Sequence, residues 1–127
     1  MRRFGFETVN LKPILTPETI SWPDFEKVDM RVGTIVEAQP FAKARKPAYQ
    51  LTIDFGPLGI RRSSAQLTTL YQPGDLLGKQ VIAVLNFPPK QIATFMSECL
   101  VMGSVGEEGT ITLLQPERPV ENGLRIG

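Results

Sequence analysis

The chain has 127 residues and a net charge of +1, and its 42% hydrophobic and 21% charged content is that of an ordinary globular protein. At this length one domain buries about two thirds of its unfolded surface, so it needs neither a disulfide nor a structural metal. The single cysteine, Cys99, excludes a disulfide within the chain, and the absence of histidine removes the usual general base and the commonest metal ligand. We therefore expect a protein that is not an enzyme and has no metal and no cofactor.

The sequence contains no segment that predicts a membrane span. The longest aliphatic run, Val81–Leu85, is far shorter than the roughly 20 residues that a spanning helix needs. Arg2 and Arg3 resemble the start of an export signal, but Glu7 and Lys12 interrupt the apolar region that such a signal requires. We expect a cytoplasmic protein without membrane insertion.

Residues 1–19 show little periodicity, which predicts a partly ordered N-terminal extension ahead of a single domain over residues 20–127. A short helix is expected to begin at either Thr16–Thr19 or Ser21–Asp24. The first and last residues of the second segment have the spacing of a capping box, in which each side chain accepts a hydrogen bond from the other residue's backbone.

Alternation of apolar and polar residues predicts two strands, Met30–Ala38 and Tyr49–Phe55. In the first strand every second residue from its start shares one face, and Gly33 on the other face indicates a bend or a close approach. The second strand has one buried and one solvated face. Turn residues at Gly56–Gly59 predict that Ile60–Ser64 pairs back as a third strand.

Leucine and tyrosine residues at helical spacing predict a helix over Ala65–Tyr71, followed by a short turn at Asp75–Leu77. Three apolar runs of strand length follow, namely Val81–Phe87, Cys99–Val105 and Thr110–Gln115. Together these elements predict a mainly β fold: a five-stranded oligonucleotide/oligosaccharide-binding (OB) barrel with a short helix between strands 3 and 4, plus an N-terminal helix and a C-terminal strand extension. A β-sandwich is the alternative, but it usually has more strands and no central helix.

Positive charge is concentrated in residues 31–62, which hold six Lys or Arg against two Asp or Glu. The loop between the first two strands, Phe41–Tyr49, contributes Lys43, Arg45 and Lys46, and in an OB barrel this loop borders the ligand face. Cations neutralise phosphates and aromatic rings stack on unpaired bases, so the loop favours binding of single-stranded or looped nucleic acid. The alternative is that the cations are only solvated and that the aromatic rings at both ends of the loop pack into the barrel.

Arg61 and Arg62 lie on the third strand, where neighbouring side chains point to opposite faces. Arg62 shares a face with Ile60, so we expect at least one of the two arginines to serve a binding site. Ser64 and Gln66 follow as candidate hydrogen-bonding partners of a ligand, although capping of the next helix is the alternative.

The loop Asn86–Ile92 follows the most apolar strand and contains two consecutive prolines, which predicts a rigid, positioned loop. Phe87, Ile92, Phe95 and Met96 are more hydrophobic than a free loop needs. Three interpretations stay open for them: packing in the core, contact within a dimer, or an apolar groove for an extended peptide.

Four segments, taken together and in this order, are similar to a known family: DMRVGTIVEAQPF, KARKPAYQLTIDFGPLGIRRSSAQ, GKQVIAVLNFPPKQIATFMSE and LLQPERPVENGLRIG. Over residues 20–127 the chain resembles the CsaA family of secretion-linked chaperones, which is related to the tRNA-binding domain of methionyl- and phenylalanyl-tRNA synthetases. The resemblance implies an OB barrel, a homodimer without catalytic activity, and binding either of unfolded preproteins and the Sec export motor or of tRNA.

By position, the resemblance places the asparagine and lysine of the family's tRNA-binding loop at Asn86 and Lys90, and a later serine at Ser97. The full set of candidate ligand-binding residues is Lys43, Arg45, Lys46, Tyr49, Arg61, Arg62, Ser64, Gln66, Asn86, Phe87, Lys90 and Ser97. At the dimer interface we expect the N-terminal helix and the C-terminal strand and tail, with Trp22, Phe25, Thr110, Ile111, Leu113 and Ile126. The alternative for Trp22 is that it plugs the open end of its own barrel.

Two functions follow from the sequence. The favoured one is a homodimeric chaperone that holds unfolded segments of exported proteins, with apolar grooves for side chains and basic rims for charged parts. The alternative is a structure-specific tRNA-binding protein. They differ in their dependence on salt, because neutralising about five phosphates makes RNA affinity fall steeply with salt, whereas apolar burial is much less sensitive.

Overall fold

The structure is a computed structural model that describes residues 17–127. Its elements run in the order α1 (Trp22–Glu26), β1 (Met30–Pro40), β2 (Tyr49–Asp54), η1 (Gly56–Leu58), β3 (Ile60–Ala65), α2 (Pro73–Leu76), β4 (Gln80–Val84), β5 (Lys90–Ile92), β6 (Phe95–Ser97), β7 (Leu100–Val101), β8 (Gly103–Val105), η2 (Glu107–Gly109) and β9 (Ile111–Leu113). Of the extension predicted over residues 1–19, residues 1–16 lie outside the described residues, and residues 17–19 are exposed coil.

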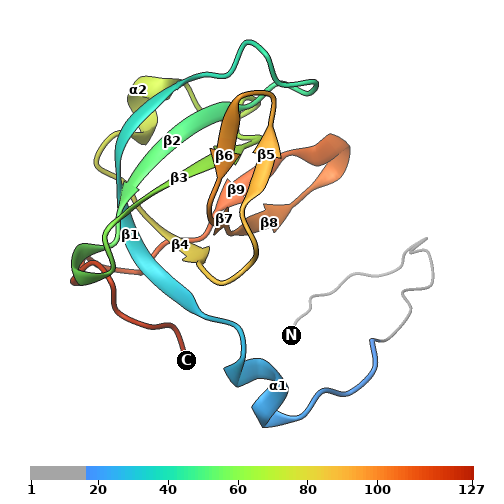
Figure 1. The fold of residues 1–127 in the computed structure, drawn as a ribbon, viewed down its shortest axis with the longest axis vertical. Helices are drawn as coiled ribbons and strands as arrows, with labels where there is room; N and C mark the ends of the chain where they lie inside the picture. The colour runs from blue at the N-terminus through green and yellow to red at the C-terminus, as the bar shows by residue number, and fades with distance from the viewer. Residues whose placement is uncertain (1–16) are drawn as a thin grey trace, which may run out of the picture.

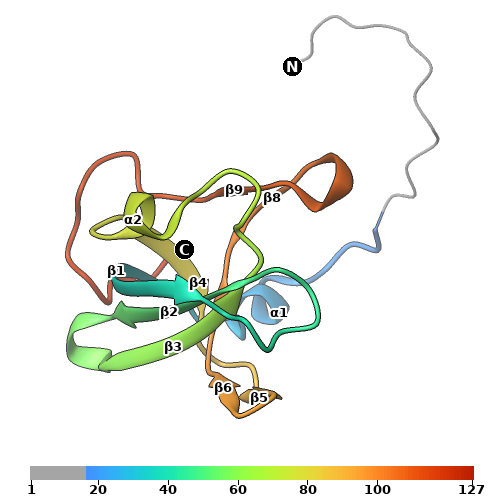
Figure 2. The same cartoon turned by 90° about the horizontal axis from the view of Figure 1, so that it is seen from above.

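The main structural unit is a curved antiparallel sheet of five strands in the order β3-β2-β1-β4-β7 (Figure 1). It curls until β3 lies against β7, which gives a nearly closed barrel. The β5–β6 and β8–β9 hairpins are separate two-stranded sheets outside it (Figure 2). The mainly β fold class, the five-stranded OB-type barrel and the short helix between β3 and β4 are therefore confirmed.

Strand β2 supplies the centre of the core. Leu51 and Ile53 on β2 and Phe55 just after it are fully buried, whereas the residues between them are partly exposed. The predicted alternation of this strand is confirmed. Around it the main core cluster gathers further buried residues from the strands, from α2 and from the segments that connect them, namely Ile35, Tyr49, Ala65, Leu67, Leu76, Val81, Ala83, Leu85, Cys99 and Leu113.

The regular alternation predicted for Met30–Ala38 is wrong in its second half. The register of β1 against β2 shifts between Ile35 and Glu37, so Val36 is an extra residue in a β-bulge and is exposed. The bulge lets Ala38 pack on the same core as Ile35, although the two residues are an odd number apart. Sequence periodicity does not reveal a bulge, because one inserted residue exchanges the two faces of the strand.

The helix predicted over Ala65–Tyr71 is also wrong. Strand β3 continues to Ala65, a single helical hydrogen bond joins the Tyr71 N–H to the Leu67 carbonyl, and the helix itself is α2. Gln72 is extended because it precedes Pro73, and a proline disfavours the helical conformation in the residue before it. Pro73 then begins α2 without losing a hydrogen bond.

Helix α1 begins at the second of the two predicted positions. The Asp24 N–H donates to Ser21 Oγ at 3.2 Å, and the Ser21 N–H donates to Asp24 Oδ2 at 3.3 Å, which is a capping box. Trp22 is 65% exposed, so it does not plug its own barrel. Among the described residues 17–127, no helix is long and apolar enough to cross a membrane.

The strand predicted over Cys99–Val105 divides into two. Leu100 and Val101 form β7 in the barrel, and Gly103–Val105 forms β8, which pairs with β9. The chain then returns along β1, where the Val32 N–H donates to the Leu124 carbonyl and the Ile126 N–H donates to the Met30 carbonyl. This tail covers the part of β1 that β2 does not reach.

Gly33 should not tolerate a side chain. A Cβ atom there would lie 2.6 Å from Phe55 Cε1 and 2.7 Å from Ile53 Cγ2, so Gly33→Ala forces core side chains to move. We expect it to lower the free energy of unfolding by about 3 kcal/mol in urea titration. Gly74→Ala is the matched control, because nothing lies within 4 Å of the added carbon, and it should change stability by less than about 1 kcal/mol. Equal midpoints for the two variants would contradict the close approach.

Burial of Cys99 makes the free energy of unfolding depend on pH in the alkaline range. Burial raises the pKa of its thiol from 9.0 to about 12, although the charge of Arg61 acts in the opposite direction. The unfolded thiol therefore ionises at lower pH than the folded one, so the stability that the protonated thiol contributes is complete below pH 9.0 and is lost as the pH rises toward 12.

We expect wild-type protein to lose about 1.4 kcal/mol more unfolding free energy between pH 8 and pH 10 than Cys99→Ala does, because the net loss of protonation in the unfolded state over this range amounts to one pKa unit. Urea titrations of both proteins at the two pH values measure this difference, and other titrating groups cancel in the comparison. Parallel pH profiles would show that the thiol ionises equally easily in both states.

Candidate ligand-binding groove

Three adjoining pockets form a groove beside strand β3. Ser64 and Gln66, at the end of β3, line all three pockets. We call them the cationic pocket, the central pocket and the apolar pocket, and together we call them the groove. Their volumes are about 880 Å³, 370 Å³ and 370 Å³.

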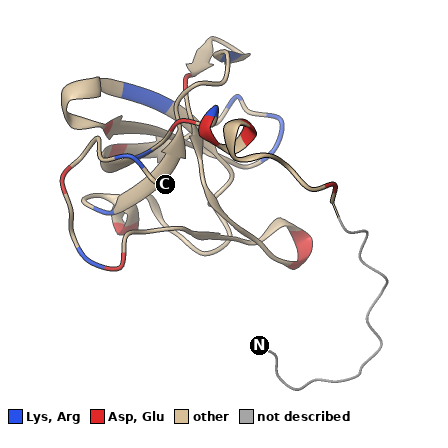
Figure 3. Cartoon of the chain, turned by 90° about the horizontal axis from the view of Figure 1, so that it is seen from below, with Lys and Arg blue, Asp and Glu red and all other residues tan. Residues whose placement is uncertain are grey.

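The cationic pocket lies between two walls. One wall is the basic loop, residues 41–48, which contributes Lys43, Arg45 and Lys46, and the other is the β5–β6 hairpin with Lys90. Figure 3 shows the loop and the hairpin at the same end of the barrel. All four cations are exposed, and within residues 17–127 none of them forms a salt bridge. Their charge is therefore free to act on an anionic ligand.

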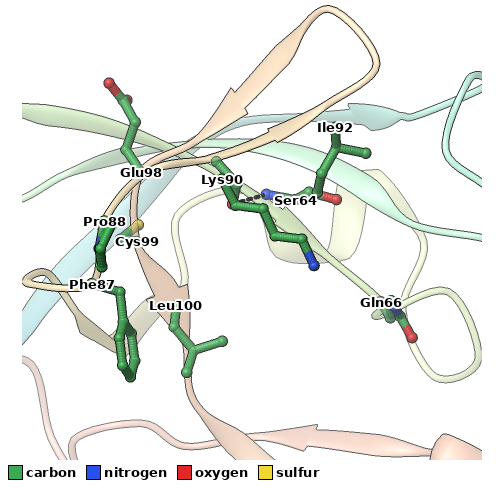
Figure 4. A pocket seen from close by; sticks show the side chains of 10 residues that line it. Ser64, Gln66, Phe87, Pro88, Lys90, Ile92, Glu98, Cys99 and Leu100 are labelled. Atoms are coloured by element: carbon green, nitrogen blue, oxygen red, sulfur yellow. Dashed lines mark hydrogen bonds between the residues drawn. The ribbon is translucent and has the colours of Figure 1, made fainter.

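The central pocket is lined by polar and apolar groups. Figure 4 shows the Lys90 side chain extending over the opening, with Phe87 and Leu100 at its other side and Glu98 pointing away. Phe87 is 56% exposed, and it is the one aromatic residue among those that line the three pockets. Glu98 is the one acid among them, so the groove as a whole is positively charged.

The apolar pocket continues the groove between the end of β3 and the β8–β9 hairpin. Its apolar lining is Leu67, Leu100, Val101, Met102, Val105 and Ile111. Val105 is 76% exposed, which is unusual for an aliphatic residue on a strand. The apolar run Cys99–Val105 predicts a strand but gives no sign of a binding role. Consecutive apolar residues give no alternation, so nothing in the sequence distinguishes a groove wall from core.

Side chains close the barrel next to the groove. The Ser64 N–H donates to Ser97 Oγ at 3.0 Å, and the Arg62 N–H donates to Glu98 Oε1 at 2.9 Å. In return the Glu98 N–H donates to the Arg62 carbonyl at 2.7 Å, and Ser63 Oγ donates to the Cys99 carbonyl. Ser97, predicted as a ligand residue, therefore lines the groove and also joins β6 to β3.

Asn86 lies outside the three pockets and joins two parts of the chain. Its Oδ1 accepts the Asp29 N–H at 3.0 Å and its Nδ2 donates to the Lys27 carbonyl at 2.6 Å. Both ends of the amide are thus occupied in fixing the residues after α1 against the end of β4. A ligand role for Asn86 stays a prediction, and the structure gives this residue a structural one.

Three other predicted ligand residues also lie outside the three pockets. Tyr49 is buried in the main core and its hydroxyl donates to the Tyr71 carbonyl at 2.7 Å. Arg61 Nη1 donates to the Leu85 carbonyl, and the Arg62 guanidinium lies 4.3 Å from the centre of the Phe95 ring. Of the predicted set, the groove brings together Lys43, Arg45, Lys46, Ser64, Gln66, Phe87, Lys90 and Ser97.

The predicted dimer residues have mixed surroundings. Leu113 is buried in the core of its own barrel, and Ile111 lines the apolar pocket, so both already have neighbours within one chain. Trp22 and Phe25 lie on α1 with their rings 5.4 Å apart. Arg125 Nη2 donates to the Glu26 carbonyl, which brings the C-terminal tail and its residue Ile126 next to α1. The role of these residues in a dimer stays a prediction, as does that of Thr110.

Known proteins resemble both the sequence and the fold. A family model described as "Putative tRNA binding domain" matches residues 30–125. The chain is 49% identical to the chaperone CsaA from Bacillus anthracis, whose crystal structure superposes with a TM-score of 0.83 over 87% of this chain and 100% of that one. For the CsaA chaperone from Picrophilus torridus the identity is 48% and the TM-score 0.80, with 86% and 100% covered.

Enzymes that contain the same domain are also similar. The methionine–tRNA ligase of Bacteroides fragilis is 32% identical over 120 residues, which is 94% of this chain but 17% of the ligase. The chain thus spans about a sixth of that relative's length. From these matches the chain belongs to the tRNA-binding domain family, and in sequence and fold it is similar to the CsaA chaperones.

Proposed function

We propose that this protein is a homodimeric, export-related chaperone that binds unfolded segments of preproteins in the groove. The observation that carries the proposal is the continuity of the cationic, central and apolar pockets, which meet at Ser64 and Gln66. An unfolded polypeptide differs from a folded protein because it presents apolar and charged side chains along one extended segment. A groove with an apolar end and a cationic end offers partners to both kinds of side chain.

The energies favour apolar contacts as the main source of affinity. Exposed ion pairs contribute about 0.2–1 kcal/mol each, whereas full burial of an aliphatic side chain contributes about 1.5–3 kcal/mol. Val105 and Leu100 are both strongly exposed at the apolar end and bury more surface when a ligand covers them. The cations then set which clients bind well, because they favour segments with acidic residues near an apolar stretch.

A second candidate function, binding of tRNA, is favoured by the family match and by the four pocket cations, which form no salt bridge within the described part of the chain. The positions of the aromatic residues favour an unfolded polypeptide over RNA as the ligand. Single-stranded RNA binding usually needs exposed rings on which bases stack. Phe41 and Tyr49, at the two ends of the basic loop, are both buried, and only Phe87 offers a ring among the groove residues.

We place the proposed dimer contact on α1 and the C-terminal tail. Ile20 and Trp22 are strongly exposed apolar residues, and exposed apolar surface of this kind is typical of protein contacts. A two-fold axis through this surface puts two grooves on one particle, which raises the affinity for a long unfolded chain by avidity. Resemblance to secretion-linked chaperones supports a cytoplasmic location and action on preproteins before the Sec export motor takes them. The proposed activity is binding, without a catalytic step.

The two candidate functions make different predictions for salt. We expect a fluorescent peptide with an apolar run next to acidic residues to bind, and its dissociation constant to rise less than about fivefold between 50 and 200 mM NaCl. If RNA is held by the four cations, its affinity should fall by about 50- to 150-fold over the same salt range. Fluorescence anisotropy with the peptide and with tRNA measures both. Strong, salt-sensitive tRNA binding together with no peptide binding would refute the chaperone proposal.

A pair of variants tests the apolar pocket in the same assay. Val105→Ser removes apolar surface from the groove, and we expect it to weaken peptide binding about fivefold. Leu77→Ser is the matched control, because Leu77 is an exposed aliphatic residue that lines none of the three pockets. Equal effects of the two substitutions would place the peptide elsewhere.

The dimer has its own test. Light scattering after gel filtration should give wild-type protein twice the mass of one chain, and Trp22→Ser should shift it to the monomer, because the substitution removes the largest exposed apolar side chain of α1. Ile60→Ser, at an exposed site on β3, is the control and should stay dimeric. If Trp22→Ser has the wild-type mass, α1 is not the main contact.

A further inference from the structure

The two walls of the cationic pocket are not joined by the main sheet. The basic loop connects β1 to β2, and the β5–β6 hairpin forms a two-stranded sheet of its own. An isolated two-stranded hairpin is marginally stable in water, so its position has to come from packing against the barrel. Side-chain contacts must therefore set the distance between the two walls.

A small hydrophobic cluster lies under both walls. Phe95 of β6 is 3% exposed and packs with Phe41 and Ala48, and the ring centres of Phe95 and Phe41 are 5.3 Å apart. Ala44 of the loop and Ile92 of the hairpin pack on the edge of this cluster. None of these five residues belongs to the main core cluster, so this support is separate from the barrel's own core.

Phe41 and Ala48 are also the two ends of the basic loop. The Phe41 N–H donates to the Ala48 carbonyl at 3.0 Å, which closes the loop at its base. Lys43, Arg45 and Lys46 all lie between these two residues. Phe95 of the hairpin therefore contacts the base of the loop, and the three cations lie on the part of the loop that this base supports.

Arg62 completes this arrangement. Its guanidinium lies 4.3 Å from the centre of the Phe95 ring, and its backbone N–H and carbonyl are both bonded to Glu98, directly after β6. A cation over an aromatic face is attractive and covers the ring from solvent. Arg62 lies on β3 but lines none of the three pockets, and its contact with Phe95 gives it a role beside the groove.

We propose that Phe95, covered by Arg62, is a positioning residue of the groove that holds the basic loop at a fixed distance from the β5–β6 hairpin. Phe95 touches no ligand and acts through Lys43, Arg45 and Lys46, which meet a bound segment together with Lys90 because the two walls are held together. A preorganised set of cations loses less conformational entropy on binding than a mobile set. The inference rests on the groove being the ligand site proposed above.

A double-mutant cycle tests this role with the labelled acidic and apolar peptide. We expect Phe95→Ala to weaken binding about tenfold and the triple variant Lys43→Ala, Arg45→Ala, Lys46→Ala to weaken it about thirtyfold. If Phe95 acts through these cations, adding Phe95→Ala to the triple variant should weaken binding less than twofold further. A combined loss near three-hundredfold, the product of the separate effects, would overturn the inference.

The control is Phe87→Ala, which removes an aromatic ring that lines the groove itself. It should weaken binding by the same factor in the wild-type and in the triple variant, because a direct contact does not depend on the loop cations. Phe95→Leu keeps an apolar side chain in the cluster and should recover part of the affinity. All variants are compared at a temperature well below their thermal unfolding midpoints.

A measurement without ligand separates this inference from the proposed function. Spin labels attached through Arg45→Cys and Gln91→Cys, in a Cys99→Ala background, report the distance across the cationic pocket by electron–electron double resonance. We expect a narrow distance distribution with Phe95 present and a clearly broader one after Phe95→Ala. An unchanged distribution overturns the positioning role, whereas absence of peptide binding by wild-type protein overturns the proposed function and leaves the spin-label result to decide this inference.

Discussion

The barrel is closed mainly by side-chain hydrogen bonds, with the backbone bond from the Glu98 N–H to the Arg62 carbonyl beside them, where a full ladder of backbone bonds would be expected. This closure is the constraint on which the rest of the structure depends. Ser97 Oγ and Glu98 Oε1 accept backbone N–H groups of β3, and Ser63 Oγ donates to the Cys99 carbonyl. Strand β3 would otherwise be an open edge with unpaired donors. Small hydroxyl side chains suit this junction because they bring the two backbones close while satisfying polar groups that a closed core would otherwise leave unpaired.

The groove follows from the same junction. Side-chain bonds between β3 and segment 97–99 stop at Ser64, and from there Gln66 and Leu67 line the pockets. A continuous ladder would cover this edge with another strand. Closing the barrel through a few side chains therefore completes the core and leaves the end of β3 open to a ligand, between the cationic pocket on one side and the apolar pocket on the other.

The parts of the fold that follow local rules could be predicted from the sequence. The capping box of α1 and the alternation of β2 each depend on residues near one another in the chain. Gly33 within a strand pattern indicates a close approach, but its partners Ile53 and Phe55 lie about 20 residues away and are not given by the local pattern. The bulge at Val36 and the split of Cys99–Val105 depend on pairing partners far away in the chain, which periodicity does not report. The end of the helical turn before Pro73 has a local cause, because the proline disfavours a helical conformation at Gln72. The β5–β6 hairpin was missed for a further reason: its turn has Ala93 at a positive φ of 54°, where a glycine would have signalled the turn.

For the candidate site, residue type predicted where charge is concentrated but not which charges act together. Arg61 and Arg62 lie in the same basic segment as the loop cations, yet the first bonds a carbonyl at the end of β4 and the second covers Phe95. A strand residue's direction depends on the register of its sheet, and the packing of Phe95 depends on a hairpin that the sequence did not reveal. The four cations of the pocket share a different property: all are on segments outside the main sheet, and among residues 17–127 none of them forms a salt bridge. A nearly neutral chain can thus present a positive groove, because among residues 17–127 only one acid, Glu98, lines the groove. The Glu98 carboxylate already accepts a backbone hydrogen bond.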